Sequence, residues 1–280
     1  MTNTSYDKVI KKHKDFNDHI YTEYCNWFTY TKGQKQYNQT NFLNFLRETK
    51  LFLGDVVITS MIEFHNYIDK SVIPSYLDWM DKKTKELSLA SYSQEDVRNW
   101  IKGAIGEYFF LRMFEELRTI VVSDYTDQNK QLEHIYNFQY VSPKTASSPE
   151  DLGMDMTGVA NDIPIALQIK FWNPFVSVQD LKKSLYSPKE LVQALYSEAH
   201  CHNYVYDETD TTKNLFICCL HDETEFMDWW NRRQNKDIQR HIEVIGRRSL
   251  EATIVRKSFY TMDVLRHLQS IADVYFDKVE

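Results

Sequence analysis

The stretch Leu152–Phe171, LGMDMTGVANDIPIALQIKF, places one Asp, one Gln and one Lys inside two otherwise apolar runs. The dipeptide Asn161-Asp162 separates these runs, which is typical of the turn of a β-hairpin. A two-residue turn at this dipeptide opposes Ala160 to Ile163, and the four-residue loop that Pro164 favours gives the same register. The stretch therefore predicts two antiparallel strands with one defined pairing.

Strand alternation sorts the side chains of this hairpin onto two faces. Asp155, Gln168 and Lys170 share one face, on which Asp155 stands opposite Gln168. The other face is apolar and consists of Met154, Met156, Ile165, Leu167, Ile169 and Phe171. A loop of three residues would mix the two sets, so the clean sorting supports the register.

A long helix is predicted over residues 97–117, VRNWIKGAIGEYFFLRMFEEL, upstream of the hairpin. The dipeptide Ser93-Gln94 provides an N-cap, and an acidic first turn follows it. Glu107 shares a face of this helix with residues that are otherwise small or apolar, namely Trp100, Gly103, Ala104, Phe110, Leu111 and Phe114. Burial of an unpaired carboxylate is costly, so we expect Glu107 to meet a partner.

Together, the two carboxylates, the amide and the ammonium group predict a site for a hard divalent cation. Mg²⁺ binds oxygen ligands and keeps several water molecules, one of which can attack phosphorus. Lys170 can orient or deprotonate that water and balance negative charge in the transition state. A structural reading stays open beside this one: a buried ion pair between Asp155 and Lys170, with Glu107 bound to a backbone amide.

Three segments, Gly106-Glu107, Gly153-Met154-Asp155 and Gln168-Ile169-Lys170, resemble the motif of the PD-(D/E)xK nuclease superfamily in its QxK variant. Mrr-like restriction endonucleases carry this variant, and the resemblance spans residues 97–220. It implies an α/β fold with a restriction-endonuclease-like αβββαβ core, in which helices flank a central mixed sheet.

The resemblance also implies roles for individual residues. Glu107, Asp155, Gln168 and Lys170 would be catalytic. Glu107, Asp155 and the backbone carbonyl of Ile169 would hold Mg²⁺, for which Mn²⁺ can substitute. Gln168 stands where most members have Glu, and a neutral amide is a weaker ligand than a carboxylate. Glu107 must therefore supply the missing charge.

The implied activity is that of a Mg²⁺-dependent DNA endonuclease, which hydrolyses phosphodiester bonds in restriction or antiviral defence. A second reading is a nuclease subunit that waits for an ATPase or helicase partner, which the acidic chain fits because it holds DNA weakly alone. A third reading is a catalytically inactive nuclease-like scaffold or binding module. A cutter of both strands with one site per chain would suit a homodimer.

Along the chain, the pattern predicts a helical N-terminal domain over residues 1–92 and a nuclease-like domain over residues 93–280. Residues 126–151 are expected to form a polar, mobile connection. Further strands and helices are expected beyond the long helix and the hairpin. The strands are 118–125, 214–220 and 242–246, and the helices are 187–200, 225–234 and 261–276.

The formal charge of −7 argues against a nonspecific nucleic-acid coat protein. Residues 231–268 are nevertheless basic, with nine Lys or Arg against four Asp or Glu. This segment is either a solvated helical surface or a surface that faces phosphate groups. The candidate nucleic-acid-binding residues are Lys182, Lys183, Arg232, Arg233, Arg247 and Arg248.

The four cysteines, Cys25, Cys201, Cys218 and Cys219, form no CxxC pair and are few for a chain of 280 residues. The polar N-terminal segment lacks the apolar stretch of a signal peptide. The apolar runs are shorter than the ~20 residues that a membrane-spanning helix requires. We therefore expect a cytoplasmic protein without a membrane partner.

Overall fold

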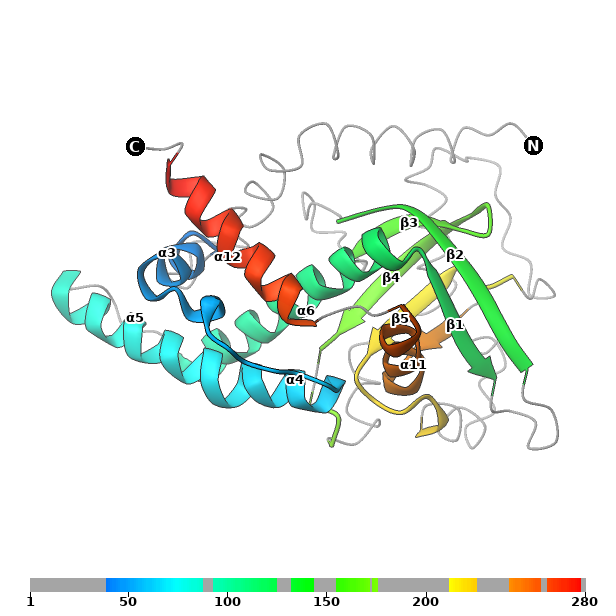
Figure 1. The fold of residues 1–280 in the computed structure, drawn as a ribbon, viewed down its shortest axis with the longest axis horizontal. Coiled ribbons are helices and arrows are strands. Elements are labelled where there is room, and N and C mark those ends of the chain that lie inside the picture. The colour runs from blue at the N-terminus through cyan, green and yellow to red at the C-terminus, as the bar shows by residue number, and fades with distance from the viewer. Residues whose placement is uncertain are drawn as a thin grey trace. The chain divides into compact units, whose positions relative to one another are not determined.

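The structure is a computed structural model that describes residues 39–87, 93–124, 132–143, 155–171, 173–175, 212–225, 242–257 and 261–277 (Figure 1). These residues form two compact units, and each is described by itself. Unit 1 contains the described residues from 110 to 257. Unit 2 contains those from 39 to 109 and from 261 to 277. The units interleave along the chain, whereas the sequence suggested one boundary between residues 92 and 93.

Unit 2 is built from helices. They are α3 (Gln39–Thr49), the 3-10 turn η1 (Leu51–Leu53), α4 (Met61–Tyr67), the π-helical segment η2 (Ile68–Val72), α5 (Ile73–Leu87), the first part of α6 (Gln94–Leu117) and α12 (Thr261–Asp277). Helix α12 packs against α3, and the side-chain amide of Gln269 donates a 2.8 Å hydrogen bond to the carbonyl oxygen of Leu46. The predicted closing helix is therefore confirmed, and it packs with the N-terminal helices.

Aromatic side chains fill the core of unit 2. Phe42 and Phe45 of α3 meet Tyr76 of α5, with ring centroids 5.5 Å and 5.2 Å apart. All three side chains are fully buried. Edge-on ring pairs of this kind add to the stability that burial itself supplies. Packing therefore accounts for these aromatic residues of the N-terminal region.

Helix α6 contributes to both units, because its residues up to Phe109 belong to unit 2 and those from Phe110 onward belong to unit 1. The backbone N–H of Asp96 donates a 3.2 Å hydrogen bond to Oγ of Ser93, which is the expected N-cap. The long helix predicted upstream of the hairpin is therefore confirmed, together with its start.

Unit 1 contains a six-stranded mixed sheet with the order β1-β2-β3-β4-β5-β6. The strands are β1 (Thr119–Asp124), β2 (Leu132–Pro143), β3 (Met156–Ala160), β4 (Ile163–Lys170), β5 (Leu215–Cys219) and β6 (Ile242–Ile245). From β1 to β4, each strand runs antiparallel to the next one, whereas β4, β5 and β6 are parallel. Helix α11 (Arg247–Lys257) follows β6 and packs near β1. The expected α/β class is confirmed.

The turn between β3 and β4 has the geometry that the sequence predicts. Asn161 and Asp162 adopt positive φ angles of 48° and 65°, as the two central residues of a type I′ turn require. The ladder begins with Ala160 opposite Ile163 and keeps this register to the start of β3. The predicted pairing is therefore confirmed over the described ladder.

The connection predicted over residues 126–151 is wrong, because it contains the twelve-residue strand β2. Buried and exposed side chains alternate along β2: Tyr136 and Phe138 are buried, whereas Asn137 and Gln139 are exposed. This is the period-two pattern of a strand with one solvated face. The polar residues of that face made the segment look like a loop, so the sheet has one strand more than predicted.

The sheet curls until it is nearly barrel-shaped. Glu243 on β6 accepts a 2.5 Å hydrogen bond from the hydroxyl of Tyr136 on β2, and it lies 3.2 Å from Nδ1 of His134. In a flat sheet, the four steps from β2 to β6 would separate these strands by about 19 Å. The rings of Tyr136 and Phe138 also pack on Phe216 of β5. The aromatic core of unit 1 therefore lies on the concave face.

Three more helices complete the comparison with the sequence. The helix predicted over residues 187–200 lies outside the described residues, and so does the helix over 225–234 except for its first residue. Helix α11 was not predicted. Its run of Thr253, Ile254 and Val255 consists of β-branched residues, which lower helix propensity. Tertiary packing decides the conformation of this segment.

Candidate functional site

Asp155 lies immediately before β3, at the end of the ladder that joins β3 to β4. Its backbone N–H donates a 2.9 Å hydrogen bond to the carbonyl oxygen of Leu167. Its Oδ2 accepts a 2.6 Å hydrogen bond from the backbone N–H of Ile169. The carboxylate therefore satisfies a strand donor that would otherwise need a backbone acceptor. This bond holds the carboxylate in line with the hydrogen bonds of the sheet.

The carbonyl oxygen of Ile169 is a second oxygen atom on the side of β4 where the Asp155 carboxylate lies. In an extended strand, the N–H and the C=O of one residue point toward the same neighbouring strand. The carbonyl of Ile169, which the resemblance implies as a metal ligand, therefore faces the side of β4 on which Asp155 lies. A carboxylate and a carbonyl are both hard oxygen ligands, so these two residues fit a Mg²⁺ ion.

Gln168 and Lys170 flank Ile169 on β4. Gln168 is buried beside Ile217 of β5, whereas Lys170 is partly exposed. With the residues that the structure describes, Lys170 forms no hydrogen bond or ion pair. The alternative ion pair between Asp155 and Lys170 is thus not formed, and the carboxylate binds a backbone N–H instead. The ammonium group is available to a water molecule or a phosphate oxygen.

Cys218 on β5 lies next to Ile169 in the sheet register. Burial, with smaller contributions from Cys219 and the negative charge of Asp155, raises the pKa of the Cys218 thiol well above its usual value. Burial likewise raises the pKa of Cys219. Both thiols therefore stay protonated at neutral pH, and neither is suited to bind a metal ion or attack a substrate.

Glu107 lies on the part of α6 that belongs to unit 2, whereas Asp155, Gln168 and Lys170 belong to unit 1. Its approach to the strand residues therefore stays a prediction. Of the other three predicted catalytic residues, Gln168 and Lys170 lie on β4 on either side of Ile169, and Asp155 lies directly before β3, which pairs with β4.

The two faces of the sheet differ beside this site. Phe114, near the end of α6, packs on Phe138 with ring centroids 4.6 Å apart. Register and alternation place Leu167 on the same face as Phe138, and Gln168 on the opposite face. Lys170 shares the face of Gln168, whereas α6 packs through Phe114 on the face of Leu167.

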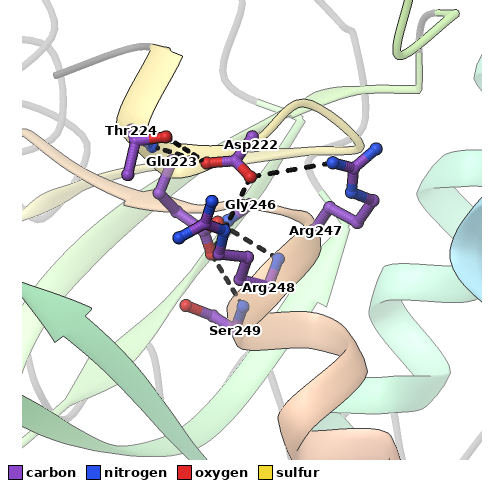
Figure 2. A network of polar contacts seen from close by, with 7 residues as sticks. All are labelled: Asp222, Glu223, Thr224, Gly246, Arg247, Arg248 and Ser249. Carbon is purple, nitrogen blue, oxygen red and sulfur yellow. Dashed lines mark hydrogen bonds and ion pairs between the residues drawn. The ribbon is translucent and has the colours of Figure 1, made fainter. Parts of the chain in front are cut away.

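A second polar cluster joins the segments that follow β5 and β6 (Figure 2). Oδ2 of Asp222 accepts a 2.7 Å hydrogen bond from Nε of Arg248 and lies 3.6 Å from the guanidinium group of Arg247. Oδ1 of Asp222 accepts hydrogen bonds from the backbone N–H and the hydroxyl of Thr224. Burial alone would raise the pKa of Asp222, but these bonds and the charge of Arg248 together lower it. Asp222 is therefore ionised at neutral pH.

Glu223, almost completely buried, caps the N-terminus of α11. Its carboxylate accepts hydrogen bonds from the backbone N–H groups of Gly246, Arg248 and Ser249, at 3.1, 3.1 and 2.8 Å. The negative charge thus meets the positive end of the helix dipole. An added Cβ at Gly246 would lie 2.6 Å from the carbonyl oxygen of His221 and 2.8 Å from Cδ of Glu223. Only glycine leaves room for this cap.

Of the predicted nucleic-acid-binding residues, the structure describes Arg247 and Arg248, which both pair with Asp222. The other four, Lys182, Lys183, Arg232 and Arg233, lie outside the described residues. Part of the arginine charge is therefore balanced within unit 1, and contact of either residue with DNA stays a prediction.

Asp222 and Glu223 were not predicted as parts of a site. The available signal was their position, because they follow a buried strand just as Arg247 and Arg248 follow the next one. Parallel strands bring such segments together at their carboxyl ends. The contact of Tyr136 and His134 with Glu243 had no such signal, because β2 itself was not predicted.

Comparisons with protein families, with curated proteins and with solved structures find no match to this chain. Within the described ranges, no three His, Cys, Asp or Glu side chains gather into a group that could hold a metal ion. The predicted site differs from such a group, because it combines two carboxylates with a backbone carbonyl. No helix in the described part of the chain has both the length and the apolar character needed to cross a membrane.

Proposed function

We propose that the chain is a Mg²⁺-dependent DNA endonuclease that hydrolyses phosphodiester bonds at the end of the β3–β4 hairpin. The observation that carries this proposal is the 2.6 Å hydrogen bond from the backbone N–H of Ile169 to the carboxylate of Asp155. This bond holds the Asp155 carboxylate on the side of β4 toward which the carbonyl of Ile169 points. Lys170, which carries an ammonium group, is the next residue after Ile169. Hard oxygen ligands beside a cation suit the hydrolysis of a phosphodiester.

Each residue would have a separate task. Asp155 and the carbonyl of Ile169 would hold Mg²⁺, with Glu107 as a further carboxylate. When bound, the ion supplies Lewis acidity and lowers the pKa of a water ligand. Lys170 would orient the attacking water and balance the negative charge of the phosphate oxygens. Gln168 adds no charge, and its amide would orient neighbouring groups through hydrogen bonds.

The order of the strands also supports the proposal. Strand β3 is antiparallel to both β2 and β4, and β5 is parallel to β4. This order is compatible with an αβββαβ core that is extended by β1 at one edge and by β6 at the other. We therefore include a restriction-endonuclease-like core in the proposal.

The biological setting in this proposal comes from the resemblance to PD-(D/E)xK nucleases. It is restriction or antiviral defence in the cytoplasm. A chain with a formal charge of −7 binds DNA weakly by itself, so an ATPase or helicase partner fits. A homodimer would bring one site to each strand of a duplex.

Cleavage of supercoiled plasmid tests the proposal. The wild-type chain with Mg²⁺ or Mn²⁺ should convert the plasmid to nicked or linear forms, and EDTA should prevent this. Lys170→Ala should abolish cutting with little loss of stability, because the ammonium group pairs with none of the described residues. Asp162→Asn is the matched control, since Asp162 lies in the turn at the opposite end of β4, and this variant should cut like wild type.

Two results would contradict the proposal in different ways. Cutting that survives Lys170→Ala would remove the strand residues from the chemistry. Absence of cutting by the wild-type chain with either metal ion, and with ATPase or helicase partners added, would favour the inactive scaffold instead.

A further inference from the structure

Both polar clusters of unit 1 lie at the carboxyl end of the sheet, where the parallel strands β4, β5 and β6 finish. The register aligns Ile169, Cys218 and Ile245 in one row across these strands. Lys170 follows this row on β4, and Arg247 follows it after β6. The backbone N–H of Arg247 also donates a 2.9 Å hydrogen bond to the carbonyl oxygen of His221, which fixes the segment after β6 to the segment after β5.

The spacing along this row suits one strand of a nucleic acid. Two steps between neighbouring strands correspond to about 10 Å. Phosphates of one strand follow each other at about 3.4 Å of helix axis. A strand whose scissile phosphate lies near Lys170 can therefore place another phosphate, a few nucleotides away, near the start of α11. Carboxyl ends of parallel strands are a common location of ligand sites.

Arg247 and Arg248 are already arranged for an anion at that position. Figure 2 shows both side chains reaching the carboxylate of Asp222 from the start of α11. The side chain of Arg248 is 48% exposed and that of Arg247 is 24% exposed, whereas Asp222 is 9% exposed. The arginines therefore face solvent more than their acidic partner does. Guanidinium groups bind phosphate with the same geometry with which they bind carboxylate.

We propose that Arg247 and Arg248 form a contact surface for the phosphodiester backbone of a nucleic acid, and that Asp222 competes with phosphate for these two side chains. The carboxylate keeps the guanidinium groups in place and lowers their affinity for isolated anions. A nucleic-acid strand that also occupies the neighbouring hairpin site gains enough contacts to bind the two arginines beside Asp222 or in its place. This inference deepens the proposed function, because it rests on nucleic acid as the substrate.

Binding of a fluorescently labelled DNA duplex, measured by anisotropy in EDTA, tests the competition without any cleavage. Asp222→Asn keeps an oxygen acceptor for Thr224 and removes the charge. It should tighten binding on the order of threefold to tenfold at low salt. The double variant Arg247→Ala/Arg248→Ala should weaken binding and make the affinity less dependent on salt. In the double-variant background, Asp222→Asn should no longer tighten binding.

The matched control is Asp162→Asn, which changes the net charge equally at the opposite end of β4 and should leave affinity within about twofold of wild type. Circular dichroism of each variant separates lost binding from lost folding, and Thr224→Ala perturbs the same segment without changing its charge. The inference would be overturned if Asp222→Asn bound DNA with the affinity of wild type. It would also be overturned if Asp222→Asn tightened binding equally when both arginines are replaced by alanine. These binding results do not depend on Lys170, so a chain that binds as expected but never cuts would contradict only the proposed function.

Discussion

At the residue scale, the side chain of Asp155 has two separable roles. It completes the hydrogen bonding of β4, and it places a negative charge beside a backbone carbonyl. Asp155→Asn keeps an oxygen acceptor for the N–H of Ile169, whereas Asp155→Ala removes it. We expect Asp155→Ala to lower the free energy of unfolding by about 2 kcal/mol, and Asp155→Asn to lower it by less. Urea denaturation of both variants measures this difference, and equal losses would argue against the hydrogen bond.

Gln168 offers a second test at this scale. Because Gln168 is buried next to the residue that binds Asp155, Gln168→Glu would add a carboxylate beside an existing one. Like charges destabilise each other, and a divalent cation relieves the repulsion. We expect a lower melting temperature than wild type without metal, and a larger increase when Mn²⁺ is added. Gln168→Met is the neutral control. If Mn²⁺ raised the melting temperature of Gln168→Glu only as much as that of wild type, this would contradict the position of Gln168 beside Asp155.

At the element scale, the cap on α11 depends on the absence of a side chain at Gly246. Gly246→Ala would force a Cβ against the carbonyl of His221 and the carboxyl of Glu223. We expect a loss of about 1–3 kcal/mol in the free energy of unfolding. Gly103→Ala is the matched control, because a Cβ there meets no atom within 4 Å, and it should stabilise α6 by about 0.5–1 kcal/mol. Thermal unfolding of both variants checks the opposite signs.

The curl of the sheet supplies another prediction for an element. Tyr136 is buried, and its hydroxyl binds Glu243 across the concave face. Tyr136→Phe keeps the ring contact with Phe216 and removes only this bond. We expect it to cost about 1.5 kcal/mol in urea denaturation. A variant as stable as wild type would mean that ring packing alone closes the sheet.

The elements also show how far the sequence carries a prediction of this fold. The β3–β4 hairpin was predictable, because Asn161 and Asp162 tolerate positive φ and the apolar face identifies one register. Strand β2 was not, because polar side chains such as Asn137 and Gln139 alternate with its buried aromatic residues. The position of Asp155 beside β4 followed from the hairpin, although the structure has this residue directly before β3 and not within it. Its bond to Ile169 did not, since the ladder departs from regular pairing at that residue.

At the scale of the whole molecule, each unit holds a buried or half-buried carboxylate with a lowered pKa. Burial would raise the pKa of Asp69 in unit 2, but Lys102 and Arg98 together lower it. The hydrogen bonds from Thr224 and the charge of Arg248 do the same for Asp222 in unit 1. Such groups stabilise the fold fully above their unfolded pKa, near 3.8, and this stabilisation is lost as the pH falls through the folded pKa.

We therefore expect wild type to lose stability below about pH 4 more steeply than Asp69→Asn or Asp222→Asn. Urea denaturation across pH 2–7, at a fixed ionic strength of about 0.1 M, measures the slopes. Parallel curves for wild type and both variants would show that these carboxylates do not contribute to the acid sensitivity of the molecule.

The proposed metal site is tested on the full chain, because Glu107 belongs to one unit and Asp155 to the other. The most direct test of the account is a Mn²⁺ titration of the full chain, in which electron paramagnetic resonance detects the unbound ion. Wild type and Asp162→Asn should each bind one equivalent of Mn²⁺ that Asp155→Asn fails to bind. Equal Mn²⁺ binding by wild type and Asp155→Asn would contradict the account.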